Sequence, residues 1–283
     1  MKTIYVYFLC ILALVGISIY GCNDTDEPTS EDILINWDTI STVNPPYQLV
    51  QPGTLPPIPV EETNPLTTEG VELGRRLFYD PILSGNKTQS CASCHPDGGS
   101  DSVTWIFPDG PRQTPPLWNA VQTLPWHWSA ALDEAQDVED TIQRIQHGIG
   151  LAPDSDPALL GIPNAGRSAE LDALAAYLQS GIRSPNLSLE TSTDISGRSL
   201  FISNGCAACH GGANWASSKL AGSPGTLDGD GNSMVDSVLR NVGTLNARDI
   251  RGGLGFDPPS LLAVGLSFPY FHDGSTQTLE ALL

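Results

Sequence analysis

Basic residues are scarce in this chain, which has 13 lysines and arginines against 32 acidic residues and a formal net charge of −19. Nucleic-acid binding requires a basic face that neutralises phosphates, so this balance argues against a nucleic-acid-binding protein. The same charge predicts that a protein partner would dock through a basic surface of its own.

No cysteine pair remains for a disulfide: four of the six cysteines fall in two Cys-x-x-Cys-His motifs about a hundred residues apart, Cys10 lies in an N-terminal apolar run, and Cys22 stands at its end. Cysteines at this spacing form thioethers with the two vinyl groups of a haem, and the histidine that follows binds the iron from the proximal side. A zinc site made from the two cysteine pairs is the alternative, but the histidine after each pair favours two covalent c-type haems. The motif residues are Cys91, Cys94 and His95 in the first copy and Cys206, Cys209 and His210 in the second.

Few side chains remain to bind either haem iron on its distal face. The chain has five histidines and two methionines, and Met1 belongs to a targeting segment. At most one haem can therefore have histidine–methionine ligation, and then only through Met234. His127, between two tryptophans, either binds an iron or makes hydrogen bonds to a haem propionate or the backbone. Met234, in a loop rich in glycine and aspartate, is either a ligand or exposed, and His147 is expected to be solvated or to cap a helix.

The first residues have the features of a targeting segment. Lys2 is followed by an apolar run over residues 4–19 that is too short and too abruptly ended to favour a membrane span. The run ends in Ile-Tyr-Gly-Cys, which resembles a bacterial lipobox. We therefore expect a signal peptide over residues 1–21, lipid on Cys22, and a location in the bacterial cell envelope, on the periplasmic side or the cell surface. Ordinary signal cleavage, with Cys22 left as a free thiol, is the alternative.

The rest of the chain repeats one unit twice. Each unit has a Gly-Arg-x-Leu-Phe segment, a haem motif, a Pro-Pro pair and a later proline. Leu117 precedes Pro125 by the same number of residues as Leu261 precedes Pro269, which indicates a duplicated haem-binding unit. We expect an acidic, proline-rich tether over residues 22–64, a first haem domain over 65–185 (the first unit) and a second over 186–283 (the second unit).

The predicted fold is all-α, with two tandem cytochrome c-like domains and long loops. Apolar spacing predicts helices over residues 67–79, 133–147 and 168–179. Ser168 suits the N-cap of the last helix, and Gly181 suits its end. No segment has the pattern of a sheet. Because the chain stops within ten residues of His272-Asp273-Gly274, we expect the second domain to be truncated and to lack its C-terminal helix.

Several stretches resemble the bacterial di-haem cytochrome c peroxidase family and its methylamine-utilisation relatives, over about residues 65 to 283. The resemblance implies that one high-potential haem relays electrons and that a low-potential haem reduces hydrogen peroxide, with a tryptophan between them at the position of Trp128. It also implies that His272 is not an iron ligand but a structural residue or one that supports the ligands, and it leaves open a calcium ion between the domains. The stretches are Leu77 to Pro81, Pro115 to Ala120, and Pro269 to Ser275.

The sequence departs from the family in one respect: residues 96–115 contain no histidine, where the peroxidases usually carry a distal one. We therefore expect at least one open or water-bound iron. The predicted function is reduction of hydrogen peroxide with electrons from a small basic donor protein, with Gln136 and Glu139 as acid–base candidates. The alternatives are a non-enzymatic electron-transfer cytochrome and a haem-bearing surface binding module. A homodimer is left open.

Overall fold

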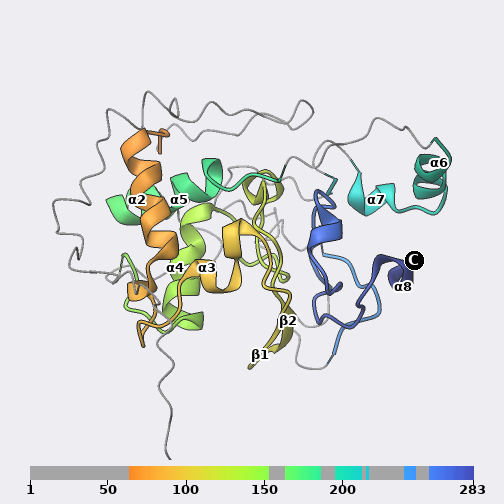
Figure 1. Cartoon of the computed structure of the whole chain (residues 1–283), viewed down its shortest axis with the longest axis horizontal. Coiled ribbons are helices and arrows are strands. Elements are labelled where there is room, and N and C mark those ends of the chain that lie inside the picture. Colours follow the sequence, from red (N-terminus) through yellow and green to blue (C-terminus); the bar gives the residue numbers. More distant parts are fainter. Residues whose placement is uncertain (1–63, 153–162, 186–194, 212–214, 217–238, 247–254) are drawn as a thin grey trace, which may run out of the picture. The chain divides into compact units, whose positions relative to one another are not determined.

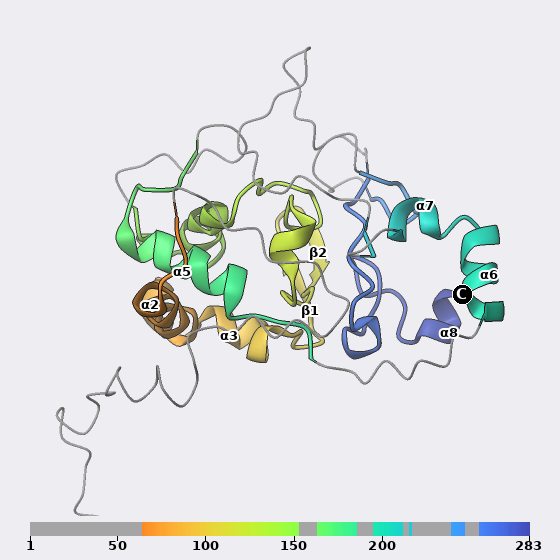
Figure 2. The same ribbon diagram turned by 90° about the horizontal axis from the view of Figure 1, so that it is seen from above.

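The computed structural model describes residues 64–152, 163–185, 195–211, 215–216, 239–246 and 255–283. The expected signal peptide, Cys22, most of the tether and Met234 lie outside these ranges. Within them, no helix combines the length and apolar character that a membrane span needs. Short elements separated by loops dominate, and the two longest helices, α2 and α5, belong to the first unit (Figures 1 and 2).

Helix α2 (Thr68–Tyr79) has the extent that its sequence predicts. The Thr67 hydroxyl accepts a hydrogen bond from the Gly70 backbone N–H at 3.1 Å, which caps the first turn. The buried residues lie three and four positions apart, so they form one helical face. These residues are Val71, Gly74 and Phe78.

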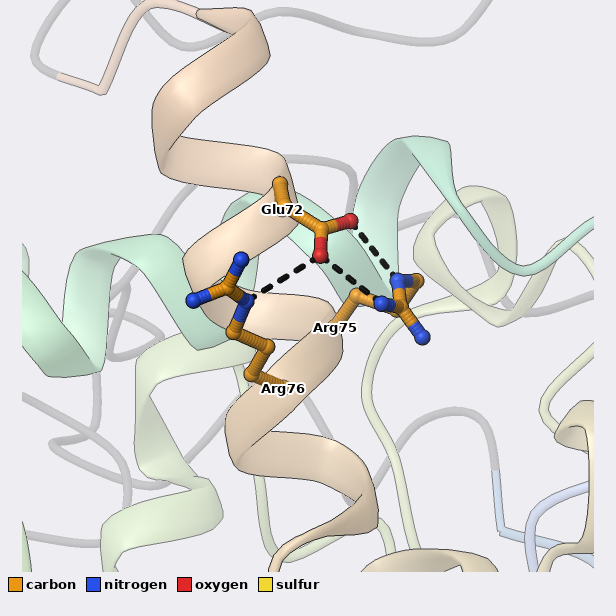
Figure 3. A network of polar contacts seen from close by, with 3 residues as sticks. All are labelled: Glu72, Arg75 and Arg76. Atoms are coloured by element: carbon orange, nitrogen blue, oxygen red, sulfur yellow. Dashed lines mark hydrogen bonds and ion pairs between the residues drawn. The ribbon is translucent and has the colours of Figure 1, made fainter. Parts of the chain in front are cut away.

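The outer face of α2 has a small charged network (Figure 3). The Glu72 carboxylate accepts two hydrogen bonds of 2.7 Å from Arg75 and one of 3.2 Å from the Nε of Arg76. The Arg75 guanidinium is the main cause of a lowered Glu72 pKa, against the opposing effect of partial burial. Both arginines are about half exposed, so the network adds only a few tenths of a kcal/mol, roughly, to α2.

Helix α5 (Ala169–Ser180) packs against α2 and forms the centre of the core. Ser168 is its N-cap, because its hydroxyl accepts from the Leu171 N–H at 3.0 Å, and the helix ends at Gly181 as the sequence predicts. Nearly every residue from Leu171 onward is buried. The helices approach so closely that a Cβ on Gly74 would overlap the Ala173 carbonyl oxygen.

The prediction of one continuous α-helix over residues 133–147 is wrong. The segment divides into a 3₁₀ turn, a single α turn and a π-helical turn. Asp137 accepts hydrogen bonds from the backbone N–H groups of Asp133 and Glu134, so its side chain competes with regular helical bonding. The three pieces are η4 (Ala135–Asp137), α4 (Val138–Asp140) and η5 (Thr141–Ile145).

A small sheet also departs from the all-α expectation. Strands β1 (Thr104–Phe107) and β2 (Gly110–Gln113) form an antiparallel hairpin in which Trp105 is opposite Arg112. Aromatic and β-branched residues fill β1, and the Asp-Gly pair at the turn is a common hairpin signal, with Gly110 at a φ of +114°. The sequence therefore contained a hairpin signal, but a four-residue strand is too short to show clear alternation.

The remaining elements show the repeat in three dimensions. An antiparallel bridge joins Trp126 to Leu132 in the first unit, and an equally spaced bridge joins Tyr270 to Thr276 in the second. The unit boundaries stay a prediction, although this shared local geometry supports duplication. The other elements are η1 (Pro81–Leu83), α3 (Cys91–Cys94), η2 (Pro96–Gly98), η3 (Ala120–Thr123), α6 (Ile195–Ser203), α7 (Ala207–His210), η8 (Val264–Leu266) and α8 (Leu279–Leu282).

Candidate haem sites

The first Cys-x-x-Cys-His motif forms the short helix α3. Ser90 caps it, since the Ser90 N–H donates to the Ser93 hydroxyl at 2.9 Å. One helical turn places Cys91 and Cys94 on the same face, and His95 follows with its N–H bonded to the Cys91 carbonyl. Burial raises the pKa of both thiols to about 11, so both are protonated at neutral pH in the chain without a bound group.

The His95 imidazole is oriented by backbone carbonyls. Its Nδ1 donates to the Gly99 carbonyl at 3.3 Å, and the Pro115 carbonyl makes a second hydrogen bond to the ring. A proton on Nδ1 leaves the lone pair on Nε2 available for an iron. Burial lowers the pKa of His95, which favours the neutral form that coordinates metal.

The second motif repeats this arrangement. His210 ends α7, and its Nδ1 donates to the Pro259 carbonyl at 3.0 Å. Burial lowers the pKa of His210 as well. Pro115 and Pro259 occupy equivalent places in the two units, so the repeated Pro-Pro pair supplies a carbonyl that orients each proximal histidine. The sequence showed the repeat of this pair but gave no sign of the role of its carbonyl.

The donor set of each motif fits a covalent haem better than a zinc ion. Among the described residues, no three histidine, cysteine or acidic side chains are placed so that they could hold one metal ion. A structural zinc site needs about four such ligands in tetrahedral geometry. The two cysteine pairs therefore do not converge, which contradicts the zinc alternative.

His127 lies close to the first motif. It has a left-handed backbone with a φ of +65°, and its Nε2 is 3.3 Å from the Thr141 hydroxyl. Burial is the main reason that the pKa of His127 falls to about 4, and the charge of His95 lowers it further. That second effect means that the two imidazoles are near enough to interact electrostatically. His127 is therefore neutral at physiological pH.

Trp128 connects the first unit to the second. Its indole N–H donates to the Gln113 carbonyl at 2.8 Å, and its own carbonyl accepts from the Asp257 N–H at 2.9 Å. The indole meets the His272 ring edge to face, with ring centres 6.4 Å apart. His272 is buried and stacks on Phe256 with centres 3.7 Å apart, which agrees with its expected structural role.

Gln136 and Glu139 are both buried, but their side chains make hydrogen bonds to residues away from the motif. The Gln136 amide donates to Asp172 on α5 at 3.3 Å. The Glu139 carboxylate accepts from the Leu151 and Ala152 N–H groups at 2.8 and 3.1 Å and so anchors that loop. Their acid–base role stays a prediction. His147 is exposed, as expected.

A buried acidic pair beside Gln136 was missed by the sequence analysis. Asn164 bridges the pair, because its backbone N–H donates to Glu134 and its side-chain amide donates to Asp137. Burial, followed by the charge of Glu134, raises the pKa of Asp137 to about 8. Five of the eight residues over 133–140 are acidic, but the sequence gives no signal that two of them form a buried pair.

Comparison with known proteins finds similarity to di-haem cytochrome c peroxidases. Residues 68–157 match the family described as di-haem cytochrome c peroxidase. The methylamine utilization protein MauG of Methylorubrum extorquens is 28% identical over 269 residues, covering 80% of this chain and 70% of MauG. The cytochrome c551 peroxidase of Pseudomonas aeruginosa is 24% identical, covering 79% of this chain and 74% of the peroxidase.

A solved structure supports the fold. The crystal structure of a MauG-like protein associated with microbial copper homeostasis matches with a TM-score of 0.54 and 24% identity, covering 81% of this chain and 79% of that one. The chain is therefore similar to di-haem cytochrome c peroxidases and to MauG over most of its length. It is a peroxidase-like oxidoreductase, and the similarity to di-haem proteins implies two c-type haems, for which the Cys-x-x-Cys-His motifs supply the attachment residues.

Proposed function

We propose that this protein is an exported di-haem cytochrome that reduces hydrogen peroxide to water, with the first haem site as the place where peroxide binds. The observation that carries the proposal is His127, a half-buried histidine whose pKa is lowered by desolvation and by the charge of the proximal His95. A haem attached at Cys91 and Cys94 would supply the redox-active iron, with His95 on its proximal side. His127 would be the side chain available near the other face of such a haem.

His127 is suited either to coordinate the distal position reversibly or to move a proton there. Its pKa of about 4 keeps the ring neutral at neutral pH, so a nitrogen lone pair can accept a proton from bound peroxide and return it to the departing oxygen. The Thr141 hydroxyl lies 3.3 Å from His127 Nε2. A hydrogen bond between them would hold the ring in place when Nε2 neither binds the iron nor moves a proton. Gln136 and Glu139 are weaker candidates, because their hydrogen bonds hold them in the packing around α5 and the 150–152 loop.

Electrons reach this site, in the proposal, from the second haem at His210 through Trp128. The indole is hydrogen-bonded to the first unit and in ring contact with His272 of the second, which supports a relay position. The external donor is a small protein with a basic face, as the net charge of −19 favours. We further propose a calcium ion between the two domains, which the family resemblance leaves open. A homodimer is a second such proposal.

One assay separates the roles of His127 and Trp128. Peroxide-dependent oxidation of a reduced donor is measured together with the electronic spectra of both haems. His127→Ala should slow peroxide reduction by about a hundredfold, which is the low end for loss of an acid–base group, and should alter the spectrum of one haem. Trp128→Phe should slow turnover and leave both spectra unchanged.

The matched control is His147→Ala, which removes an exposed histidine on the same segment and should change neither quantity. Unchanged turnover in His127→Ala would remove the first haem site from the proposal. A Trp128→Phe variant with normal turnover would mean that electrons take another route.

The location proposal depends on the sequence alone. The apolar run followed by Cys22 supports export and lipid anchoring to the cell envelope. Replacing Cys22 by serine should move the protein from the membrane fraction to the soluble fraction in cell fractionation. Retention of the serine variant in the membrane fraction would contradict a lipid anchor.

A further inference from the structure

One tryptophan near the first haem motif differs in its hydrogen-bond partner from three other tryptophans of the first unit. The indole N–H groups of Trp118, Trp126 and Trp128 donate to backbone carbonyls, at 3.3, 2.7 and 2.8 Å. The indole of Trp105 donates to a carboxylate oxygen of Asp101, at 3.0 Å. A carboxylate carries a full negative charge, so it stabilises positive charge on the donor group far more than a carbonyl does.

Asp101 is tied directly to the haem-attachment motif. Its backbone N–H donates to the Cys94 carbonyl at 3.0 Å, and its charge raises the pKa values of Cys94 and His95. Its second carboxylate oxygen accepts from the Val103 N–H at 3.0 Å, which holds the side chain in place. Trp105 is therefore separated from the Cys94 backbone by one residue and two hydrogen bonds.

We propose that Trp105 is a one-electron donor to the first haem, and that Asp101 stabilises the indole radical cation that remains. The inference rests on the proposed peroxide reduction and deepens it by naming a second redox-active group. Hydrogen peroxide takes up two electrons and two protons and leaves as two water molecules. When no electron is available from the second haem, one electron comes from the first haem and the other from Trp105. Two electrons from the external donor later restore the first haem and the neutral indole.

The positive charge of Arg112, near Trp105, would disfavour a radical cation on the indole, but a nearby carboxylate balances that charge. Arg112 is the cross-strand partner of Trp105, and a guanidinium on the same face of the hairpin would disfavour a radical cation. However, Arg112 pairs with the Asp109 carboxylate at 3.1 Å and lies over the Phe256 ring. The Asp101 carboxylate thus remains the closest charge that the indole N–H contacts.

The test is to mix the fully oxidised holoprotein with hydrogen peroxide in the absence of donor, freeze it, and record the EPR spectrum. Protein grown with ring-deuterated tryptophan identifies a tryptophan radical by narrowing of its signal. The wild type should give such a signal, and Trp105→Phe should lose it. Asp101→Asn keeps the size of the side chain but removes its charge, so the radical should decay at least about tenfold faster.

Trp118→Phe is the matched control, because that indole lies against Gly99 near the same motif but donates to a neutral carbonyl. It should keep the radical signal. A signal that survives in Trp105→Phe, or that disappears in Trp118→Phe instead, would overturn the inference. An unchanged decay in Asp101→Asn would overturn the role of the carboxylate.

Peroxide consumption by the reduced protein with its donor is measured in parallel. Normal consumption without a radical that depends on Trp105 would sink this inference and leave the proposed function intact. Absence of consumption, in a protein shown by its spectra to contain both haems, would contradict the proposed function and the inference together.

Discussion

Asp137 illustrates at the residue scale how burial changes the chemistry of one side chain. Burial and the charge of Glu134 raise the pKa of Asp137 from an ordinary value near 3.8 to about 8. The folded protein therefore holds a proton that the unfolded chain releases above about pH 4. A group with a raised folded pKa stabilises the protein fully at low pH, and this contribution is lost as pH rises from about 4 to about 8.

The measurable consequence is a fall in the free energy of unfolding between pH 5 and pH 8.5, measured by denaturant titration. Asp137→Asn should weaken this pH dependence, because the amide does not titrate. Asp80→Asn, at the exposed end of α2, is the control and should retain the dependence. Identical pH dependence in wild type and Asp137→Asn would show that Asp137 is not the group responsible.

The sequence predicted the haem-attachment residues because a contiguous chemical requirement defines them. Cys91, Cys94 and His95 must follow one another along the chain to hold one haem. The partners that orient the histidines, such as the Pro259 carbonyl, come from distant segments, and a single sequence carries no contact information of that kind. The same limit hid the Asp101–Trp105 pair, because a hydrogen bond between them depends on how the loop before β1 turns.

The packing of α2 on α5 determines stability at the scale of elements. Gly74 lies at the crossing, where a Cβ would overlap the Ala173 carbonyl oxygen and come within 2.8 Å of the Tyr177 Cβ. In an isolated helix, Gly→Ala gains about 1 kcal/mol. At this crossing the same substitution should instead lower the free energy of unfolding, because the two helices must move apart to accept the methyl group.

Gly74→Ala should therefore lower the free energy of unfolding by about 1–3 kcal/mol, the usual cost of overpacking, and lower the melting temperature. Gly265→Ala is the matched control, since nothing lies within 4 Å of a Cβ at that position. Thermal unfolding followed by circular dichroism measures both variants. A Gly74→Ala variant as stable as the wild type would mean that the helices do not pack as described.

The elements that the sequence predicted well are those with local signals. Helix α5 has its N-cap at Ser168 and its end at Gly181, and α2 has its N-cap at Thr67. The 133–147 segment failed as a continuous helix because its acidic side chains bond to backbone groups and other segments. The β1–β2 hairpin was missed because its strands are four residues long.

The whole molecule brings two similar haem units into contact through a small set of residues around Trp128. The Gln113 carbonyl at the end of β2 accepts from the Trp128 indole, and the Gln113 N–H donates to the His272 carbonyl at 2.6 Å. Gln113 therefore makes hydrogen bonds to two segments that are far apart in the sequence, one at Trp128 and one at His272. The repeat was readable from the sequence, but this contact was not, because it depends on how the units dock.

The central claim is that one haem of this peroxidase-like protein has an open iron that reacts with peroxide. The most direct measurement is the EPR and electronic spectrum of the purified protein in its oxidised and reduced states, before and after hydrogen peroxide. We expect at least one high-spin iron, and we expect peroxide to oxidise the reduced haems, with two electrons consumed per peroxide. Two low-spin haems in every redox state, with a reduced spectrum that peroxide leaves unchanged, would contradict the account and favour an electron-transfer cytochrome.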